Sequence, residues 1–218
     1  MIRAVLFDLD GTLYDRDAAM EAFAHEQFSA FQHQLPNVEV QQFLARFLDL
    51  DDHGYAKRSD LYRRLGDDFG LDASVAAELE RHFWDCYSRA CEATDDTWTT
   101  LRALRAAGKK LGVITNGETK WQRTKLEALG MGDVFDVVLV SEAEGVSKPD
   151  SRIFRRALDA CGVAAHEAMF VGDHPEIDVA AAKAAGLTAV WKRVPYWTLT
   201  AEGVFVVERL SEILPWSA

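Results

Sequence analysis

Residues 2–13 of the chain read IRAVLFDLDGTL. The segment begins with a nearly continuous apolar run that ends at Phe7, and it continues with Asp8, Asp10 and Gly11. Continuous rather than alternating apolarity is typical of a strand that is buried on both faces, as in parallel sheets. Gly11 permits a sharp turn directly after the second acid. The segment therefore predicts a buried N-terminal strand whose carboxyl end carries two carboxylates.

Apolar runs of the same kind recur in the second half of the chain, with helical patterns between them. The runs occupy residues 111–114, 137–140, 169–171 and 188–191. Strands that alternate with amphipathic helices predict an α/β fold, in which a doubly wound parallel sheet carries helices on its faces. Residues 204–207 and 210–214 are expected to add a last strand and a short helix.

Residues 15–94 break this alternation. They contain no strand pattern, and their aromatic and aliphatic residues form four stripes with helical spacing. We therefore expect an all-helical domain at 15–94, inserted after the first strand, and an α/β domain made of residues 1–14 and 95–218. The aromatic stripes are interpreted as ordinary core packing of the helices.

Composition and charge narrow the class of protein. The chain has 218 residues, of which 49% are hydrophobic, and its formal net charge is −11. Such a negative charge argues against nonspecific binding to nucleic acid or to anionic membranes. Three cysteines without CxxC spacing favour free thiols in a reducing compartment. Because we find neither a signal-peptide pattern nor a long apolar stretch, we expect a soluble cytoplasmic protein.

Asp8 and Asp10 form the first candidate reactive pair. If the strand geometry continues through them, both side chains point to one side of the sheet. Two carboxylates at ~4 Å repel by roughly 4 kcal/mol at an effective dielectric constant of ~20. The pair therefore needs a cation or a proton, which suits phosphoryl transfer by a nucleophile, an acid/base and a hard cation. The alternative is a helix cap or turn role for both acids.

Thr115, Asn116 and Gly117 follow the second predicted strand and form the next candidate. A hydroxyl and exposed backbone N–H groups at a helix N-terminus can bind a phosphate. In isolation the same pattern is explained by a threonine N-cap.

Lys148, Asp173 and Asp178 complete the candidate set. Lys148 lies in a loop before a proline, and Asp173 ends a predicted strand, five residues before Asp178. Each residue alone has an ordinary explanation as a solvated charge or a turn residue. However, open α/β sheets bind ligands at the carboxyl ends of their strands, where these residues and Asp8 are expected to meet.

This combination resembles the haloacid dehalogenase-like hydrolase superfamily. Residues 8–12 (DLDGT) look like its first motif, Thr115 its second, Lys148 its third, and Gly172-Asp173 with Asp178 its fourth. The resemblance extends over nearly the whole chain, and the helical insertion is similar to the C1-type cap of the family. It implies a Rossmann-like core and a Mg²⁺-dependent hydrolase.

The resemblance also implies residue roles. Asp8 would attack phosphorus and form an aspartyl-phosphate, and Asp10 would act as acid and then base. The metal would be held by the Asp8 and Asp173 carboxylates and the Asp10 backbone carbonyl. The remaining implied roles are charge compensation by Lys148, phosphate binding by Thr115, Asn116 and Gly117, and orientation of Lys148 or of the outer metal shell by Asp178.

Other activities remain open at this point. They include a phosphomutase, a 2-haloacid dehalogenase, a phospho-aspartate signalling module and a protein-binding module. Because halide leaves without a proton, the presence of Asp10 favours a phosphate ester over a haloacid. The expected partner is a small phosphorylated metabolite, and the aromatic residues of the insertion favour a nucleotide monophosphate. His174, directly after Asp173, is interpreted as a surface or supporting residue.

Overall fold

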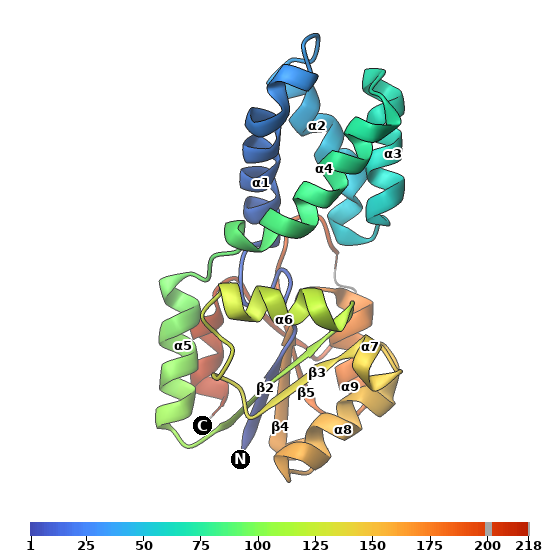
Figure 1. Ribbon diagram of the computed structural model, residues 1–218. Helices are drawn as coiled ribbons and strands as arrows, with labels where there is room; N and C mark the ends of the chain where they lie inside the picture. The colour runs from blue at the N-terminus through green and yellow to red at the C-terminus, as the bar shows by residue number, and fades with distance from the viewer. Residues whose placement is uncertain (199–201, 218) are drawn as a thin grey trace. The chain divides into compact units, whose positions relative to one another are not determined.

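The fold is taken from a computed structural model, which describes residues 1–198 and 202–217 (Figure 1). Its contacts divide the chain into two compact units, one made of residues 1–15 and 93–218 and the other of residues 16–92. We call them the sheet unit and the helical unit.

The sheet unit contains a six-stranded sheet in the order β3-β2-β1-β4-β5-β6, and each neighbouring pair is parallel. The strands are β1 (Ala4–Phe7), β2 (Lys110–Thr115), β3 (Val137–Val140), β4 (Ala168–Gly172), β5 (Thr188–Lys192) and β6 (Phe205–Val207). The predicted α/β class and the six predicted strands are confirmed. The strand order changes direction at β1, because β2 and β3 follow on one side of it and β4, β5 and β6 on the other. Such a switch point opens a crevice at the carboxyl ends of the strands.

Helices connect the strands of this unit. They are α5 (Asp95–Ala106), α6 (Thr119–Ala128), α7 (Ser141–Glu144), α8 (Ser151–Cys161), η4 (Ala165–Glu167), η5 (Pro175–Ala180), α9 (Ala181–Ala184) and η6 (Leu210–Trp216). The expected C-terminal helix is a 3₁₀ helix, and the segment after β4 begins as a π-helix rather than as an α-helix.

Apolar burial joins β1 and β4 to the helices on one face of the sheet. Leu6 and Phe170, on neighbouring strands, belong to a buried cluster with Ile153 and Phe154 of α8 and Ala182 of α9. Each side chain of β1 is fully buried, as the continuous apolar run predicts. Full burial of one large aliphatic or aromatic side chain contributes roughly 1.5–3 kcal/mol, so this cluster holds β1 and β4 firmly in place.

Residues 16–92, all of which the structure describes, contain helices and no strand, as predicted. The helices are α1 (Arg16–Phe31), η1 (Gln32–Gln34), α2 (Val40–Asp51), η2 (Asp52–Gly54), α3 (Arg58–Phe69), α4 (Ala73–Cys86) and η3 (Tyr87–Ala90). Their aromatic side chains pack on one another: Phe23 meets Phe83 edge-on at 5.3 Å, and Phe83 stacks on Tyr87 at 4.9 Å. The interpretation of the aromatic stripes as core packing is thereby confirmed.

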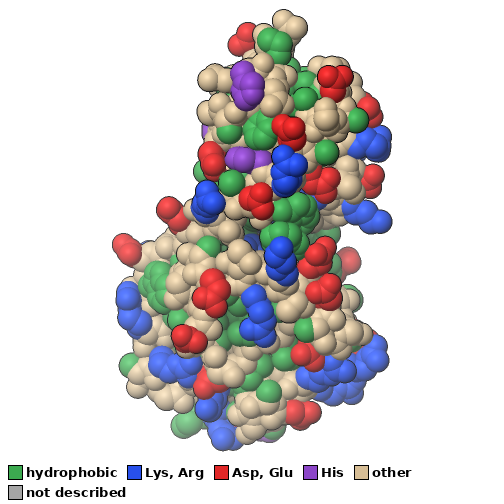
Figure 2. Space-filling model, in the orientation of Figure 1, with side chains coloured by type: hydrophobic (Ala, Val, Ile, Leu, Met, Phe, Trp, Pro, Cys, Tyr) green, Lys and Arg blue, Asp and Glu red, His purple; other side chains and the backbone are tan. Residues whose placement is uncertain are grey.

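The surface carries charged residues of both signs, in keeping with the 24 basic and 35 acidic residues of the chain. On the face that Figure 2 shows, acidic and basic side chains are interspersed over both units. Within 1–198 and 202–217, we find no helix with the length and apolarity that crossing a membrane requires.

Candidate active site

Three predicted residues emerge at neighbouring strand ends. Asp8 follows β1, Thr115 is the last residue of β2, and Asp173 follows β4. The register fixes them side by side, because Phe7 of β1 pairs with Val171 of β4 and the Asp8 N–H donates to the Val171 carbonyl at 2.9 Å. The parallel order of β2, β1 and β4 therefore brings the three residues to one edge of the sheet.

Lys148 links two of the predicted acids. Its Nζ donates to Asp8 Oδ1 at 2.5 Å and to Asp178 Oδ1 at 2.6 Å, and all three residues are at least nine-tenths buried. Although burial acts to lower the pKa of Lys148, Asp178 and Asp8 raise it above its usual value. The two carboxylates thus favour the charged form of Lys148, and charge-assisted hydrogen bonds at these distances are strong.

Asp8, Asp173 and Asp178 form a cluster of carboxylates. One oxygen from each lies within 4.8 Å of the others. Burial raises the pKa of Asp8 to about 7, against the opposing effect of Lys148, and repulsion by Asp178 and Asp10 adds to the rise. Burial likewise raises the pKa of Asp173 well above its usual value, with a further contribution from Asp8. One ammonium therefore compensates these carboxylates only in part, and the cluster is short of positive charge.

Two glycines make room for this cluster. Gly11 has a positive φ of 81°, and a Cβ at its position would lie 2.6 Å from Asp173 Oδ2. A Cβ at Gly172 would lie 2.5 Å from Asp178 Cβ. Any other residue at either position would push a carboxylate out of the cluster.

The Asp10 carboxylate has a different set of partners. Lys125 Nζ donates to both of its oxygens, at 2.6 Å for Oδ2, and Gln122 Nε2 donates to Oδ2 at 3.0 Å. The Tyr14 hydroxyl donates to Oδ1. Among the described residues, the Asp10 side chain is not part of the three-carboxylate cluster, whereas Asp178 is. Sequence reasoning missed Lys125, Gln122 and Tyr14.

The Thr115 segment is tied to its surroundings through hydrogen bonds. Thr115 Oγ1 accepts from Gln122 Nε2 at 2.6 Å, and the Gly117 N–H donates to Ser141 Oγ at 2.9 Å. Asn116 Oδ1 accepts from the Lys148 N–H, and Asn116 Nδ2 donates to the Lys148 carbonyl, both at 2.9 Å. Of the three predicted phosphate-binding residues, Asn116 therefore contacts the Lys148 loop and fixes its backbone, while Thr115 and Gly117 are bonded to Gln122 and Ser141.

His174 caps the helical segment that follows Asp173. Its Nδ1 accepts from the N–H groups of Glu176 and Ile177, both at 3.1 Å, and its ring lies 4.5 Å from the ring of Trp197. Burial lowers the pKa of His174, which favours the neutral imidazole that can accept these bonds. Its supporting role fits the sequence interpretation.

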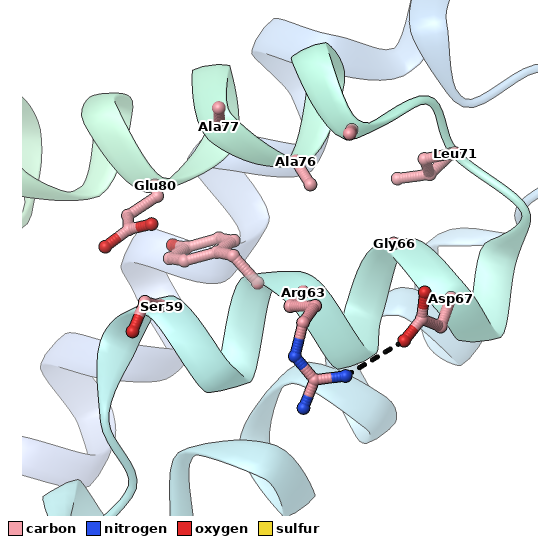
Figure 3. Close-up of a pocket in the computed structure, with 10 residues that line it drawn as sticks. Ser59, Arg63, Gly66, Asp67, Leu71, Ala76, Ala77 and Glu80 are labelled. Atoms are coloured by element: carbon pink, nitrogen blue, oxygen red, sulfur yellow. Dashed lines mark hydrogen bonds and ion pairs between the residues drawn. The ribbon is translucent and has the colours of Figure 1, made fainter.

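The helical unit contains a cavity of about 250 Å³ between α3 and α4 (Figure 3). Small residues, Gly66, Ala76 and Ala77, line it, and Arg63 and Asp67 pair at 3.2 Å on α3. Its lining residues belong to the helical unit, whereas the carboxylate cluster belongs to the sheet unit. The cavity is therefore formed within the helical unit alone.

Known proteins with similar sequences show which family the chain belongs to. Residues 2–186 match the family of haloacid dehalogenase-like hydrolases. A ribulose-1,5-bisphosphate 5-phosphatase of Halopiger xanaduensis is 34% identical over 210 residues, which cover 87% of this chain and 84% of that protein. A phosphoserine phosphatase of Thermus thermophilus is 47% identical over 91 residues, and the match spans only 42% of this chain and 36% of that protein.

A solved structure also resembles the chain over its whole length. The crystal structure of a 2-haloacid dehalogenase from Pseudomonas syringae pv. Tomato is similar with a TM-score of 0.63 at 31% identity, covering 100% of this chain and 98% of that one. With its parallel sheet and its motifs at the strand ends, the chain belongs to the haloacid dehalogenase-like hydrolases. It is an enzyme of the hydrolase class, and the predicted resemblance is confirmed.

Proposed function

We propose that the chain is a Mg²⁺-dependent phosphatase that hydrolyses a small phosphomonoester through an aspartyl-phosphate on Asp8. The observation that carries the proposal is the buried arrangement of Lys148 between Asp8 and Asp178, with Asp173 beside them. It combines a carboxylate nucleophile held in place, a buried lysine whose charged form is favoured, and a cluster of acids. These groups supply what attack on an anionic phosphate requires.

The donor set fits a hard divalent cation. Mg²⁺ prefers carboxylate and carbonyl oxygens, and the cluster offers such oxygens in a buried place that is short of positive charge. The carboxylates of Asp8 and Asp173 and the backbone carbonyl of Asp10 would hold it, while Asp178 is engaged by Lys148 and by the His174 N–H at 3.1 Å. When bound, the metal would neutralise negative charge on the attacking carboxylate and the phosphate.

The protein groups would then divide the reaction between them. An Asp8 oxygen attacks phosphorus as the bond from phosphorus to the leaving oxygen breaks, and Asp10 gives a proton to that oxygen. Asp10 later takes a proton from the water that cleaves the aspartyl-phosphate, so that both acids return to their starting states. Lys148 holds Asp8 in place throughout and offsets charge on the transferred group.

Asp10 favours phosphate ester hydrolysis over dehalogenation. An alkoxide needs a proton to leave, whereas a halide does not, so an acid beside the nucleophile is useful only for the ester. The Halopiger and Thermus relatives are named as phosphatases, which supports the same choice. Dehalogenation is the second candidate activity, because the solved structure with a similar fold is that of a 2-haloacid dehalogenase.

The substrate class is proposed to be a small phosphorylated metabolite. The expectation of a nucleotide monophosphate rested on aromatic residues in the insertion. Several of these rings, including Phe23, Phe43 and Phe83, are buried against one another in the helical unit. They are therefore engaged in packing, and we do not carry a nucleotide preference into the proposal.

The test is a panel of phosphate esters and 2-chloropropionate, assayed with Mg²⁺ and with EDTA. We expect Mg²⁺-dependent release of phosphate from at least one ester, its loss with EDTA, and no release of chloride. The Asp8→Asn variant should lose at least ~10⁴-fold in kcat while it stays folded, because it cannot form the acyl phosphate. Chloride release without phosphate release, or near-normal turnover by Asp8→Asn, would refute the proposal.

A further inference from the structure

Helix α6 presents two polar side chains to Asp10. Gln122 and Lys125 are three residues apart and so lie on the same side of the helix. Lys125 Nζ donates to both Asp10 oxygens, and Gln122 Nε2 donates to Asp10 Oδ2 at 3.0 Å. The contact between Lys125 and Asp10 joins residues that are 115 positions apart in the sequence.

The surroundings make this contact more than a surface ion pair. The side chain of Lys125 is 12% exposed and that of Asp10 is 24% exposed. The cation is therefore largely withdrawn from water, and its attraction to the carboxylate is screened less than at the surface. Gln122 Nε2 also donates to Thr115 Oγ1 at 2.6 Å, so α6 connects Asp10 to the strand end beside it.

Asp10 needs such an anchor because it lies directly before a turn at residues 11–13. It follows β1 by three residues and precedes Gly11, whose φ is positive. An acid/base group must lie within hydrogen-bond reach of the oxygen that it protonates. A displacement of ~1 Å can cost ~10²-fold in rate.

We infer that Lys125 is a positioning residue, which acts through Asp10 to place its carboxyl group for proton transfer to the leaving oxygen. Gln122 and the Tyr14 hydroxyl support the same placement. Lys125 exchanges no proton in this scheme and stays an ammonium. It holds both oxygens of ionised Asp10, the form that acts as base, and it holds the oxygen without the proton when Asp10 is the protonated acid. The inference rests on the proposed phosphatase function and adds to it the residue that controls the acid/base.

A positioning role of Lys125 and a purely structural role predict different rate losses for esters with different leaving groups. In the first half-reaction 4-nitrophenolate leaves without a proton, so attack by Asp8 on 4-nitrophenyl phosphate does not require Asp10. An aliphatic alkoxide does require the proton, and the second half-reaction requires Asp10 as base for either ester. Loss of Lys125 should therefore spare only the first half-reaction of the aryl ester.

The experiment compares Lys125→Met with wild type by rapid mixing and by steady-state assays, using 4-nitrophenyl phosphate and 2-glycerol phosphate with Mg²⁺. We expect a nitrophenol burst that is stoichiometric with enzyme and within ~3-fold of the wild-type rate. We also expect steady-state kcat for 2-glycerol phosphate to fall by ~10²-fold, with KM changed less than ~3-fold.

Three further variants complete the design. Lys125→Arg keeps a cation that can donate to both oxygens, and it should restore kcat to within ~10-fold of wild type. Lys120→Met removes an exposed lysine from the same helix and should leave both assays unchanged. Adding Lys125→Met to Asp10→Asn should cost less than ~3-fold more, because the lysine acts through the acid that is already lost.

The outcomes are distinct. A burst that falls in parallel with 2-glycerol phosphate turnover, or losses that multiply in the double variant, would overturn the inference and leave the phosphatase proposal standing. A wild-type protein that hydrolyses neither this pair of esters nor any ester of the wider panel would overturn the proposed function, and the inference with it.

Discussion

The side-chain amide of Asn116 is bonded at both ends to the backbone of Lys148, accepting from its N–H and donating to its carbonyl, each at 2.9 Å. The amide of one strand-end residue thus fixes the loop that carries the buried ammonium. Lys148 in turn contacts Asp8 and Asp178. A residue expected to bind phosphate through its own N–H therefore also determines where the central cation lies.

Replacement of Asn116 by alanine is expected to lower kcat by ~10-fold or more and the free energy of unfolding by about 1–3 kcal/mol. The cost arises because the Lys148 N–H and carbonyl lose their partners in a part-buried place. Steady-state kinetics and urea unfolding measure the two effects. Glu118→Ala, two residues away at an exposed position, serves as the control and should change neither quantity appreciably. An Asn116→Ala enzyme with wild-type kcat would show that the loop holds itself in place.

Mg²⁺ should raise the Tm more at pH 8 than at pH 5. The pKa of Asp8 rises from 3.8 to about 7 in the folded protein, so the folded state binds this proton more tightly than the unfolded chain does. The cost of ionising the buried carboxylate thus develops above pH ~4 and is complete above pH ~7. A divalent cation removes that cost, because it binds the ionised form.

Thermal unfolding with Mg²⁺ and with EDTA at both pH values tests this. For the metal-free protein, Asp8→Asn should gain stability relative to wild type as the pH rises from 5 to 8. An equal Mg²⁺ effect at the two pH values, in wild type and variant alike, would place the metal elsewhere.

Gly11→Ala should weaken activation by Mg²⁺ by ~10-fold or more. The added methyl would lie 2.6 Å from Asp173 Oδ2 and would displace this carboxylate, and shifts of this kind around metal sites cost ~10–100-fold in affinity. The Mg²⁺ concentration that gives half-maximal activity is the measured quantity.

Gly108→Ala is the matched control for this change. Gly108 has a similar positive φ of 72°, and no atom lies within 4 Å of the place that an added Cβ would take. It therefore carries the same backbone strain of ~1 kcal/mol without the clash. If both variants need the same Mg²⁺ concentration for half-maximal activity, backbone strain rather than displacement of Asp173 explains the effect.

Asp51→Asn should destabilise the helical unit by about 3–5 kcal/mol. Arg16 Nη1 lies 2.8 Å and Arg58 Nη2 lies 2.6 Å from the Asp51 carboxylate, which is 2% exposed, so its loss would leave buried guanidinium charge uncompensated. Asp49→Asn breaks an exposed pair with Arg46 and should cost less than ~1 kcal/mol. Chemical unfolding followed by circular dichroism measures the difference.

The contribution of Asp51 to the free energy of unfolding changes with pH in the opposite sense to that of Asp8. Burial acts to raise the pKa of Asp51, but the two arginines lower it below its usual 3.8. Its stabilisation is therefore complete above pH ~4 and is lost only in stronger acid. A difference between wild type and Asp51→Asn that disappears already at pH 6 would contradict this assignment.

The fold could be predicted closely from local patterns. The apolar run at residues 2–7 and the four later runs match β1 to β5, because strands buried on both faces leave a continuous signal in sequence. The segment after β4 was less predictable: its residues have helical spacing, but the chain first forms a π-helix at Pro175–Ala180. Spacing alone cannot distinguish the two at this length.

Most residues of the candidate site could be predicted from the sequence, but fewer of their side-chain contacts could. Asp8, Asp173 and Lys148 could be placed together because strand ends of a parallel sheet converge. Lys125 gave no such signal, because a lysine on an amphipathic helix looks like any solvated charge. Its contact with Asp10 joins residues 115 positions apart, and only the tertiary structure shows it. The same holds for the side-chain bonds of Asn116.

The interruption of the sheet unit after β1 has a consequence for biosynthesis. Ala4 of β1 pairs with Lys110 of β2 and with Ala168 of β4, so its first partner strand leaves the ribosome only about a hundred residues later. The contacts of the helical unit are local by comparison, and we expect it to form first while β1 waits without a partner. In the nascent chain the apolar segment of β1 thus stays without a partner strand until β2 has been synthesised, and we expect it to need shielding from water during that interval.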